Sequence, residues 1–150
     1  MKIEDLRIGN LVSVNNKQFH PNLKGAILRV TGLHERSRNG VVEASVNLEC
    51  ERETYSQFIE YIKPVVLTEQ WLLDFGFEDE GGDDYIVTKG EYTLLLTVEK
   101  ASIRVFLFHL YGTYNSKHTF LKDILYVHQL QNLYFALMQE ELILKERSKQ

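Results

Sequence analysis

Apolar and polar residues alternate in short stretches over the first 66 residues, and turn residues separate these stretches. The clearest stretch is Val41–Leu48, in which every even-numbered residue is apolar. This period of two predicts a half-buried β-strand. The pair Asn39-Gly40 before it is typical of a tight hairpin turn, so the preceding stretch, Ala26–Leu33, is expected to pair with it. Shorter strands are expected before and after this hairpin.

The predicted strands of residues 1–66 are four or five in number, short and apolar on one face. Such strands must curl to protect their edges, and a small antiparallel β-barrel of the SH3-like kind is the simplest arrangement that does so. Pro64 cannot donate a hydrogen bond to a neighbouring strand, so the last strand is expected to end there or to lie at an edge. We therefore expect one small barrel-like domain over residues 1–66.

A short helix with a clear start and a clear stop is predicted over residues 69–75. Thr68 is a good N-cap residue. Gly76 suits the left-handed position that ends a helix, and Phe77 can then fold back toward Leu72 in a Schellman arrangement. This helix begins the second predicted domain, which extends over residues 67–150.

A β-meander and a longer helix are expected to complete the second domain. The acidic stretch Glu78–Asp84 is interpreted as a solvated turn, because it lacks the alternating ligand spacing of a calcium-binding loop. The strands are predicted at about 85–89, 91–99 and 102–111, and the helix at about 125–138, where apolar residues recur at helical spacing. The chain as a whole is thus predicted to be α+β.

The strand predicted over 102–111 is apolar on both faces. Phe106, Phe108 and Leu110 share one face, opposite Val105 and Leu107. A strand that is apolar on both sides is expected to be covered on both sides. Helices of the same domain would supply one cover, and either the barrel or a second copy of the chain would supply the other. The sequence therefore raises the hypothesis of a homo-oligomer.

Three segments together resemble a known family. They are LRIGN at Leu6–Asn10, LTE to FGF within Leu67–Phe77, and YVHQLQNLYFAL at Tyr126–Leu137. In this order they are similar to a family of short uncharacterised proteins encoded by anaerobic gut bacteria and by their phages and integrated elements. The resemblance implies a phage or mobile-element setting, and it brings no activity, ligand or active residue. Family members have Thr-Gly where this chain has Met138-Gln139, so the last helix is expected to end between Met138 and Glu141.

Charge is distributed unevenly along the chain, although the net charge is only −4. Residues 1–40 hold seven Lys/Arg against three Asp/Glu, and residues 41–100 hold four against fourteen. A basic N-terminal face could contact a nucleic-acid backbone, or it could be an ordinary solvated surface, and both interpretations stay open. The candidate contact residues are Lys17, Lys24, Arg29, Arg36 and Arg38.

No motif for catalysis, cofactor binding or metal binding is present in the sequence. The single cysteine, Cys50, lies between two glutamates, which oppose thiolate formation. The remaining polar set is His128, Gln131 and Asn132, on one flank of the long helix. It could bind a peptide or a base edge, or it could satisfy buried backbone groups.

The sequence therefore predicts a non-enzymatic accessory or protein-interaction module that needs no cofactor. A nucleic-acid-binding protein is the alternative, and an enzyme with a pocket near His128 is a weaker one. The first residues lack the apolar run of a signal peptide, and no apolar run approaches the roughly 20 residues of a membrane helix. We therefore expect a cytoplasmic protein without a membrane partner.

Overall fold

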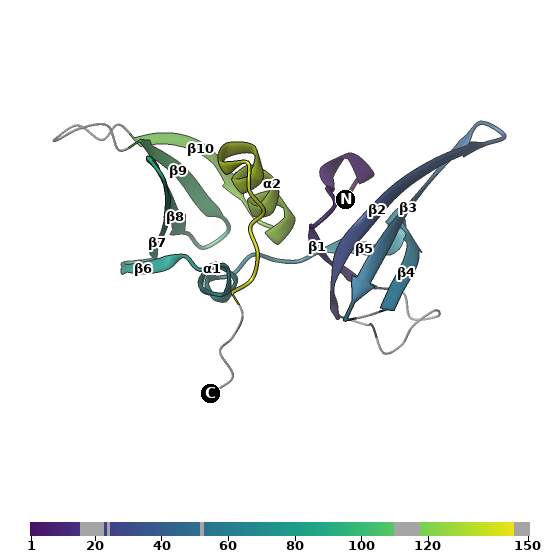
Figure 1. Cartoon of the computed structure of the whole chain (residues 1–150), viewed down its shortest axis with the longest axis horizontal. Coiled ribbons are helices and arrows are strands. Elements are labelled where there is room, and N and C mark those ends of the chain that lie inside the picture. The colour runs from purple at the N-terminus through teal and green to yellow at the C-terminus, as the bar shows by residue number, and fades with distance from the viewer. Residues whose placement is uncertain (16–22, 24, 52, 110–117, 146–150) are drawn as a thin grey trace. The chain divides into compact units, whose positions relative to one another are not determined.

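The computed structural model describes residues 1–15, 23, 25–51, 53–109 and 118–145 (Figure 1). These residues form a mixed α+β fold with two antiparallel sheets of five strands each. Two α-helices accompany the sheets in this part of the chain, α1 (Glu69–Phe75) and α2 (Val127–Met138). The predicted α+β class is confirmed. None of the helices described is long and apolar enough to span a membrane.

The chain divides into two compact units. The first unit comprises Met1–Val66 with Tyr126–Leu133, and the second comprises Leu67–Leu125 with Tyr134–Gln150. The sequence predicts all of the long helix in the second domain, whereas the N-terminal part of α2 groups with the first unit. Hydrogen bonds explain this grouping, because the backbone of Val65 pairs with that of Val127 at the start of α2.

The first sheet has the strand order β4-β3-β2-β1-β5. Its core is built from aliphatic residues with no exposed surface, among them Val12, Leu28, Val30, Val46 and Leu48. These lie on one face of β1, β2 and β3, as alternation requires. The strands are β1 (Leu11–Val14), β2 (Ile27–Arg38), β3 (Val41–Cys50), β4 (Glu53–Phe58) and β5 (Ile62–Pro64).

The first sheet is open within the described residues, because no strand pairing joins its edge strands β4 and β5. The chain passes from one edge to the other through the 3-10 turn η3 (Ile59–Tyr61). Pro64 lies in the edge strand β5, as its missing N–H predicted. The closed barrel that the sequence suggested is therefore not found in this part of the chain, and the SH3-like architecture is not confirmed.

The β2–β3 hairpin extends beyond the rest of its sheet (Figure 1). Strand β1 pairs with β2 only as far as Arg29, and β4 pairs with β3 only from Ser45 onward. Residues 35–44 therefore form a two-stranded segment, called the arm below. Its turn is the predicted Asn39-Gly40 pair, and both residues have positive φ, 52° and 77°, as the favoured two-residue hairpin turn requires.

The second sheet has the strand order β10-β9-β8-β7-β6. The three predicted strands are confirmed, although Leu110, at the end of the predicted third strand, lies outside the described residues. The acidic stretch Glu78–Asp84 contains the predicted turn, at Gly82-Asp83 with φ of 66° and 71°. Its first four residues were expected in the turn and instead form the edge strand β6. The strands are β6 (Glu78–Gly81), β7 (Asp84–Lys89), β8 (Tyr92–Val98), β9 (Ile103–His109) and β10 (His118–Ile124).

Helix α1 has the predicted bounds and the predicted C-terminal stop. Gly76 has φ of 92° and donates its N–H to the carbonyl of Leu73, while Phe77 donates to Leu72. This is the Schellman pattern. Thr68 occupies the N-cap position without a side-chain capping bond. Burial raises the pKa of Tyr85, whose hydroxyl donates to a carboxylate in the first turn of this helix.

Helix α2 ends at Met138, the earlier of the two ends that the sequence left open. Gln139 follows in the left-handed region with φ of 56°, which breaks the helical path. Its side-chain amide donates to the carbonyls of Phe135 and Ala136. Gln139 thus satisfies carbonyls of the last turn, as side chains near a helix C-terminus often do.

Candidate functional site

Gln131 is almost fully buried and holds the N-terminal segment of the first unit. It is 2% exposed, and its side-chain carbonyl accepts the N–H of Leu11 at 2.8 Å. Its amide nitrogen donates to the carbonyl of Gly9 at 3.2 Å. The side chain therefore satisfies two backbone groups where β1 begins, as buried polar groups require.

Asn132 adds to the hydrogen bonds that join α2 to the N-terminal segment, and we call this set of bonds the clasp. Its side-chain carbonyl accepts from the amide of Asn10 at 2.9 Å, and its own amide donates to the carbonyl of Asp5 at 2.9 Å. Asn10 is fully buried and also accepts the N–H of Arg7 at 2.7 Å. Side chains from two distant segments thus tie the N-terminal residues to α2 through a set of neighbouring hydrogen bonds.

His128 lies on the same flank and is 4% exposed. Its imidazole stacks on the ring of Tyr126, with ring centroids 5.8 Å apart and an interplanar angle of 10°. The structure therefore places all three predicted residues on one flank of α2 within the first unit. The bonds of Gln131 and Asn132 are those that the structural interpretation describes, whereas the predicted binding patch stays a hypothesis.

The basic residues of β2 lie on one face of the first sheet. A bulge between Val30 and Gly32 resets the alternation of β2, so that Arg29 lies on the same face as Arg36 and Arg38, although their numbers differ in parity. The partners across the ladder on β3 confirm this arrangement, because they are residues 49, 43 and 41, which share one face. Lys17 and Lys24 lie outside the described residues.

This face is mixed in charge rather than purely basic. Glu49 is the cross-strand partner of Arg29, and Glu43 is the partner of Arg36. Arg38 stands opposite Val41, which is 61% exposed. Cross-strand pairs of opposite charge stabilise a hairpin and reduce its net attraction for phosphate. The arrangement can therefore serve a mixed-charge ligand as well as a polyanion.

A groove of about 540 Å³ lies on this face of the first sheet. Its floor is Ser45 on β3, with His34 on one side and Phe58 on the other, each directly paired across the ladder. Phe58 is 51% exposed, which is unusual for a ring of this size. The residues that line the groove include His34, Arg36, Glu43, Ser45, Asn47 and Phe58.

The second sheet carries an apolar row across four strands on the face opposite its core. Leu94 and Leu96 of β8 point to the core and are fully buried, whereas Leu95 between them is only half-buried. On the same face as Leu95, successive strand pairs put four apolar residues in line. We call them the aromatic row after the two phenylalanines among them. They are Ile86, Leu95, Phe106 and Phe120.

The aromatic row is flanked on each side by a row of different chemistry on the same face. Phe106 packs edge-on against Phe120, at 5.7 Å between centroids, and against His118, at 5.9 Å. His118 also lies 5.6 Å from Phe108. The adjoining row toward the β7–β8 turn, called the third row, is Thr88, Thr93, Phe108 and His118.

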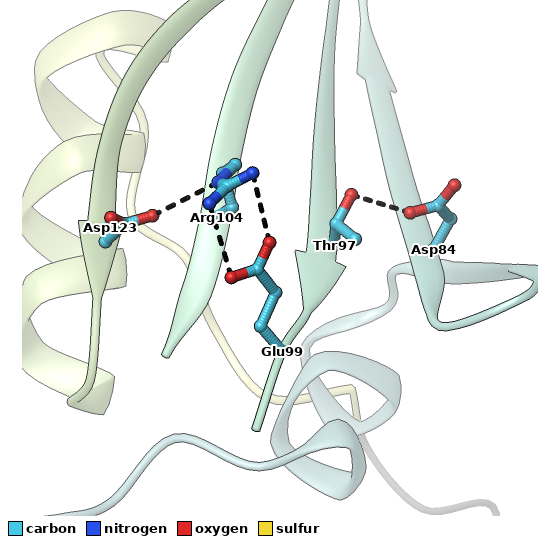
Figure 2. A network of polar contacts seen from close by, with 5 residues as sticks. All are labelled: Asp84, Thr97, Glu99, Arg104 and Asp123. Atoms are coloured by element: carbon cyan, nitrogen blue, oxygen red, sulfur yellow. Dashed lines mark hydrogen bonds and ion pairs between the residues drawn. The ribbon is translucent and has the colours of Figure 1, made fainter. Parts of the chain in front are cut away.

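The row on the other side is polar and internally bonded (Figure 2). Arg104 forms ion pairs with Glu99 at 3.1 Å and with Asp123 at 3.6 Å. The hydroxyl of Thr97 donates to Asp84 at 2.6 Å. The ion-paired side chains are well exposed to solvent, so the pairs orient them without adding much stability. The polar row is Asp84, Thr97, Arg104 and Asp123.

Sequence reasoning missed the groove for a definite reason. The alternation of residues 41–48 places Ser45 and Asn47 on the polar face, but the bulge in β2 carries no sequence signal that would place His34 opposite Ser45. Phe58 ends β4, and its exposure depends on how β4 pairs with β3. Within the ranges described, no three His, Cys, Asp or Glu residues are placed to hold a metal ion.

Comparison with known proteins gives no family for the chain: no family model, no curated protein and no solved structure matches it. The resemblance of Leu6–Asn10, Leu67–Phe77 and Tyr126–Leu137 to a phage-related family therefore stays a prediction.

Proposed function

We propose that the chain is a non-enzymatic protein-interaction module that self-associates through the aromatic row of the second sheet. The observation that carries this proposal is the alignment of Leu95, Phe106 and Phe120 across adjacent strands on the face away from the core, with Phe120 51% exposed. Contiguous exposed apolar surface of this kind marks interaction sites.

A second copy of the chain suits this face because its flanking rows are complementary to one another. A two-fold axis along the aromatic row stacks the polar row of one copy on the third row of the other. Arg104 and Phe108 are both in β9, so the guanidinium of one copy faces the ring of the other. Asp123 and His118 are both in β10, so a carboxylate faces an imidazole. Such an interface is self-complementary, as two-fold interfaces must be.

The test is the oligomeric state of a Phe120→Asp variant. The new carboxylate would be buried against its own two-fold copy, so the association is expected to weaken at least tenfold, in line with the roughly 1–3 kcal/mol penalty for unpaired polar groups. Sedimentation equilibrium over a wide range of concentration measures it. Because Phe120 is exposed in the isolated chain, the thermal unfolding of the variant is expected to stay close to that of the wild type.

Phe58→Asp is the matched control. Phe58 has the same 51% exposure and lies in the first sheet, so the variant is expected to associate as the wild type does. A wild-type chain that remains a monomer at the highest concentration reached contradicts the proposal. Equal weakening of association in both variants contradicts the assignment to the aromatic row.

Nucleic-acid binding through β2 is the second candidate function. The bulge that places Arg29, Arg36 and Arg38 on one face favours it, and Lys17 and Lys24 of the sequence prediction would add to it. Reversal of charge by Arg36→Glu with Arg38→Glu is expected to weaken oligonucleotide binding. It should also lower the slope of log K against log salt by about one for each phosphate that the variant no longer neutralises. A salt-independent affinity contradicts this candidate.

The proposal also includes the sequence predictions about biological setting and the shape of the first sheet, each supported by a separate observation. The resemblance supports a phage or mobile-element setting. The cytoplasmic location stays a prediction of the sequence. The turn η3 and the return of β5 to β1 support a curled, SH3-like first sheet. An enzyme with a site near His128 stays the weaker alternative, and a perturbed titration of that imidazole would favour it.

A further inference from the structure

We infer that the groove of the first sheet binds an unpaired nucleobase, with the ring held between Phe58 and His34 and the attached phosphate near Arg36. This inference deepens the second candidate function and is independent of self-association, because it uses a different unit of the chain. It assigns a ligand to residues that the sequence did not mark as a site. The ligand is the nucleotide unit, free or within a single strand.

The spacing of the groove suits a planar ring. His34 and Phe58 are the neighbours of Ser45 on either side, so two strand spacings, roughly 10 Å, separate their backbones. A flat ring needs about 3.5–4 Å to each stacking partner. Binding therefore requires the exposed ring of Phe58 to lean toward the imidazole by roughly the remaining 2–3 Å. Ser45 between them is small, so its own side chain leaves room for a ligand above it.

The imidazole of His34 is held in place. Its Nε2 lies 3.0 Å from the side-chain amide nitrogen of Asn47. A Cβ at Gly32 would approach that Nε2 to 3.1 Å and the Asn47 nitrogen to 3.2 Å, so the glycine leaves room for this pair. A stacking ring fixed by a hydrogen bond loses little side-chain entropy when a ligand binds.

The charges of the groove suit a base with an amino group and a phosphate. Arg36 and Glu43 are cross-strand partners at one side of the groove. Arginine binds phosphate oxygens, and a carboxylate accepts from the exocyclic amine of cytosine. Arg38 follows Arg36 on the same face and extends the cationic line along the arm. A single strand, whose bases are free to leave the stack, fits better than a duplex, whose bases are not.

The test is fluorescence anisotropy with a labelled cytosine-rich single strand at low salt, together with the matching duplex and with cytidine monophosphate as competitor. We expect the single strand to bind and the duplex to bind at least tenfold more weakly. Removal of one stacking partner in Phe58→Ala is expected to weaken binding roughly tenfold, within the range of base–aromatic stacking. Arg36→Gln is expected to weaken binding and to lower its salt dependence.

Leu73→Ala is the matched control, because the exposed apolar side chain that it shortens lies on α1 in the second unit and belongs to neither proposed surface. This variant is expected to leave the affinity unchanged. If cytidine monophosphate competes with an affinity comparable to that of the single strand, and Phe58→Ala abolishes this competition, the base site is supported and its ligand is the free nucleotide. Binding that depends on Arg36 and Arg38 but not on Phe58 overturns the inference, although it still supports nucleic-acid binding through the basic face of β2. No binding at low salt overturns both, and equal binding of an acidic peptide overturns the base site and assigns the groove to a peptide.

Discussion

Leu48→Ala is expected to lower the free energy of unfolding of the first unit by about 2–5 kcal/mol. Leu48 lies within β3, has no exposed surface and belongs to the hydrophobic core cluster of the first unit with Val30 and Val46. Shortening its side chain removes packed atoms and leaves a cavity between strands that cannot collapse freely. Urea unfolding followed by circular dichroism measures the decrease.

Val42→Ala is the control for this prediction. Val42 lies on the same strand and the same face as Leu48 but is 64% exposed, because the arm has left the core at that point. The change in stability is expected to stay within about 0.5 kcal/mol. A decrease as large as that of Leu48→Ala would show that the arm is covered in solution, contrary to the exposure of its two valines.

The local patterns of the sequence predicted the elements that depend on local physics. The period of two over Val41–Leu48 identified both the strand and its core face, since burial of one face is what selects that period. Gly76 and Phe77 predicted the end of α1, because the left-handed turn and the returning N–H involve only neighbouring residues.

The patterns failed where a partner strand decides the structure. Strand β6 has the composition of a loop and pairs only because β7 lies beside it after a two-residue turn. No residue pattern predicts the bulge at Thr31 either, although this bulge puts His34 and Arg29 on the same face. Whether the first sheet closes into a barrel depends on where its two edge strands lie, and the composition of the strands carries no information about their positions.

The candidate site shows the same division. Helical spacing correctly put His128, Gln131 and Asn132 on one flank, because residues three and four apart are neighbours on a helix. The partners of Gln131 lie about 120 positions earlier, at Gly9 and Leu11, and helical spacing says nothing about them. The sequence could therefore name the polar set and both of its roles, but it could not choose between the roles.

Gln131→Met is expected to lower the free energy of unfolding of the first unit by about 2–4 kcal/mol, because it leaves a buried donor and a part-buried acceptor without partners. Methionine keeps the length of the side chain, so the decrease reports the two hydrogen bonds rather than a cavity. Denaturant unfolding measures the stability, and native-state hydrogen exchange at the Leu11 amide, which donates to Gln131, reports the clasp directly.

Gln70→Met supplies the control. Gln70 lies on α1 and makes one exposed bond, to Asp74 within its own helix, so the stability is expected to change by less than about 0.5 kcal/mol. If Gln131→Met instead leaves both the stability and the exchange of the Leu11 amide unchanged, the clasp contributes nothing in solution. The buried amide would then be available to a ligand, and the binding interpretation of His128, Gln131 and Asn132 would be favoured over the structural one.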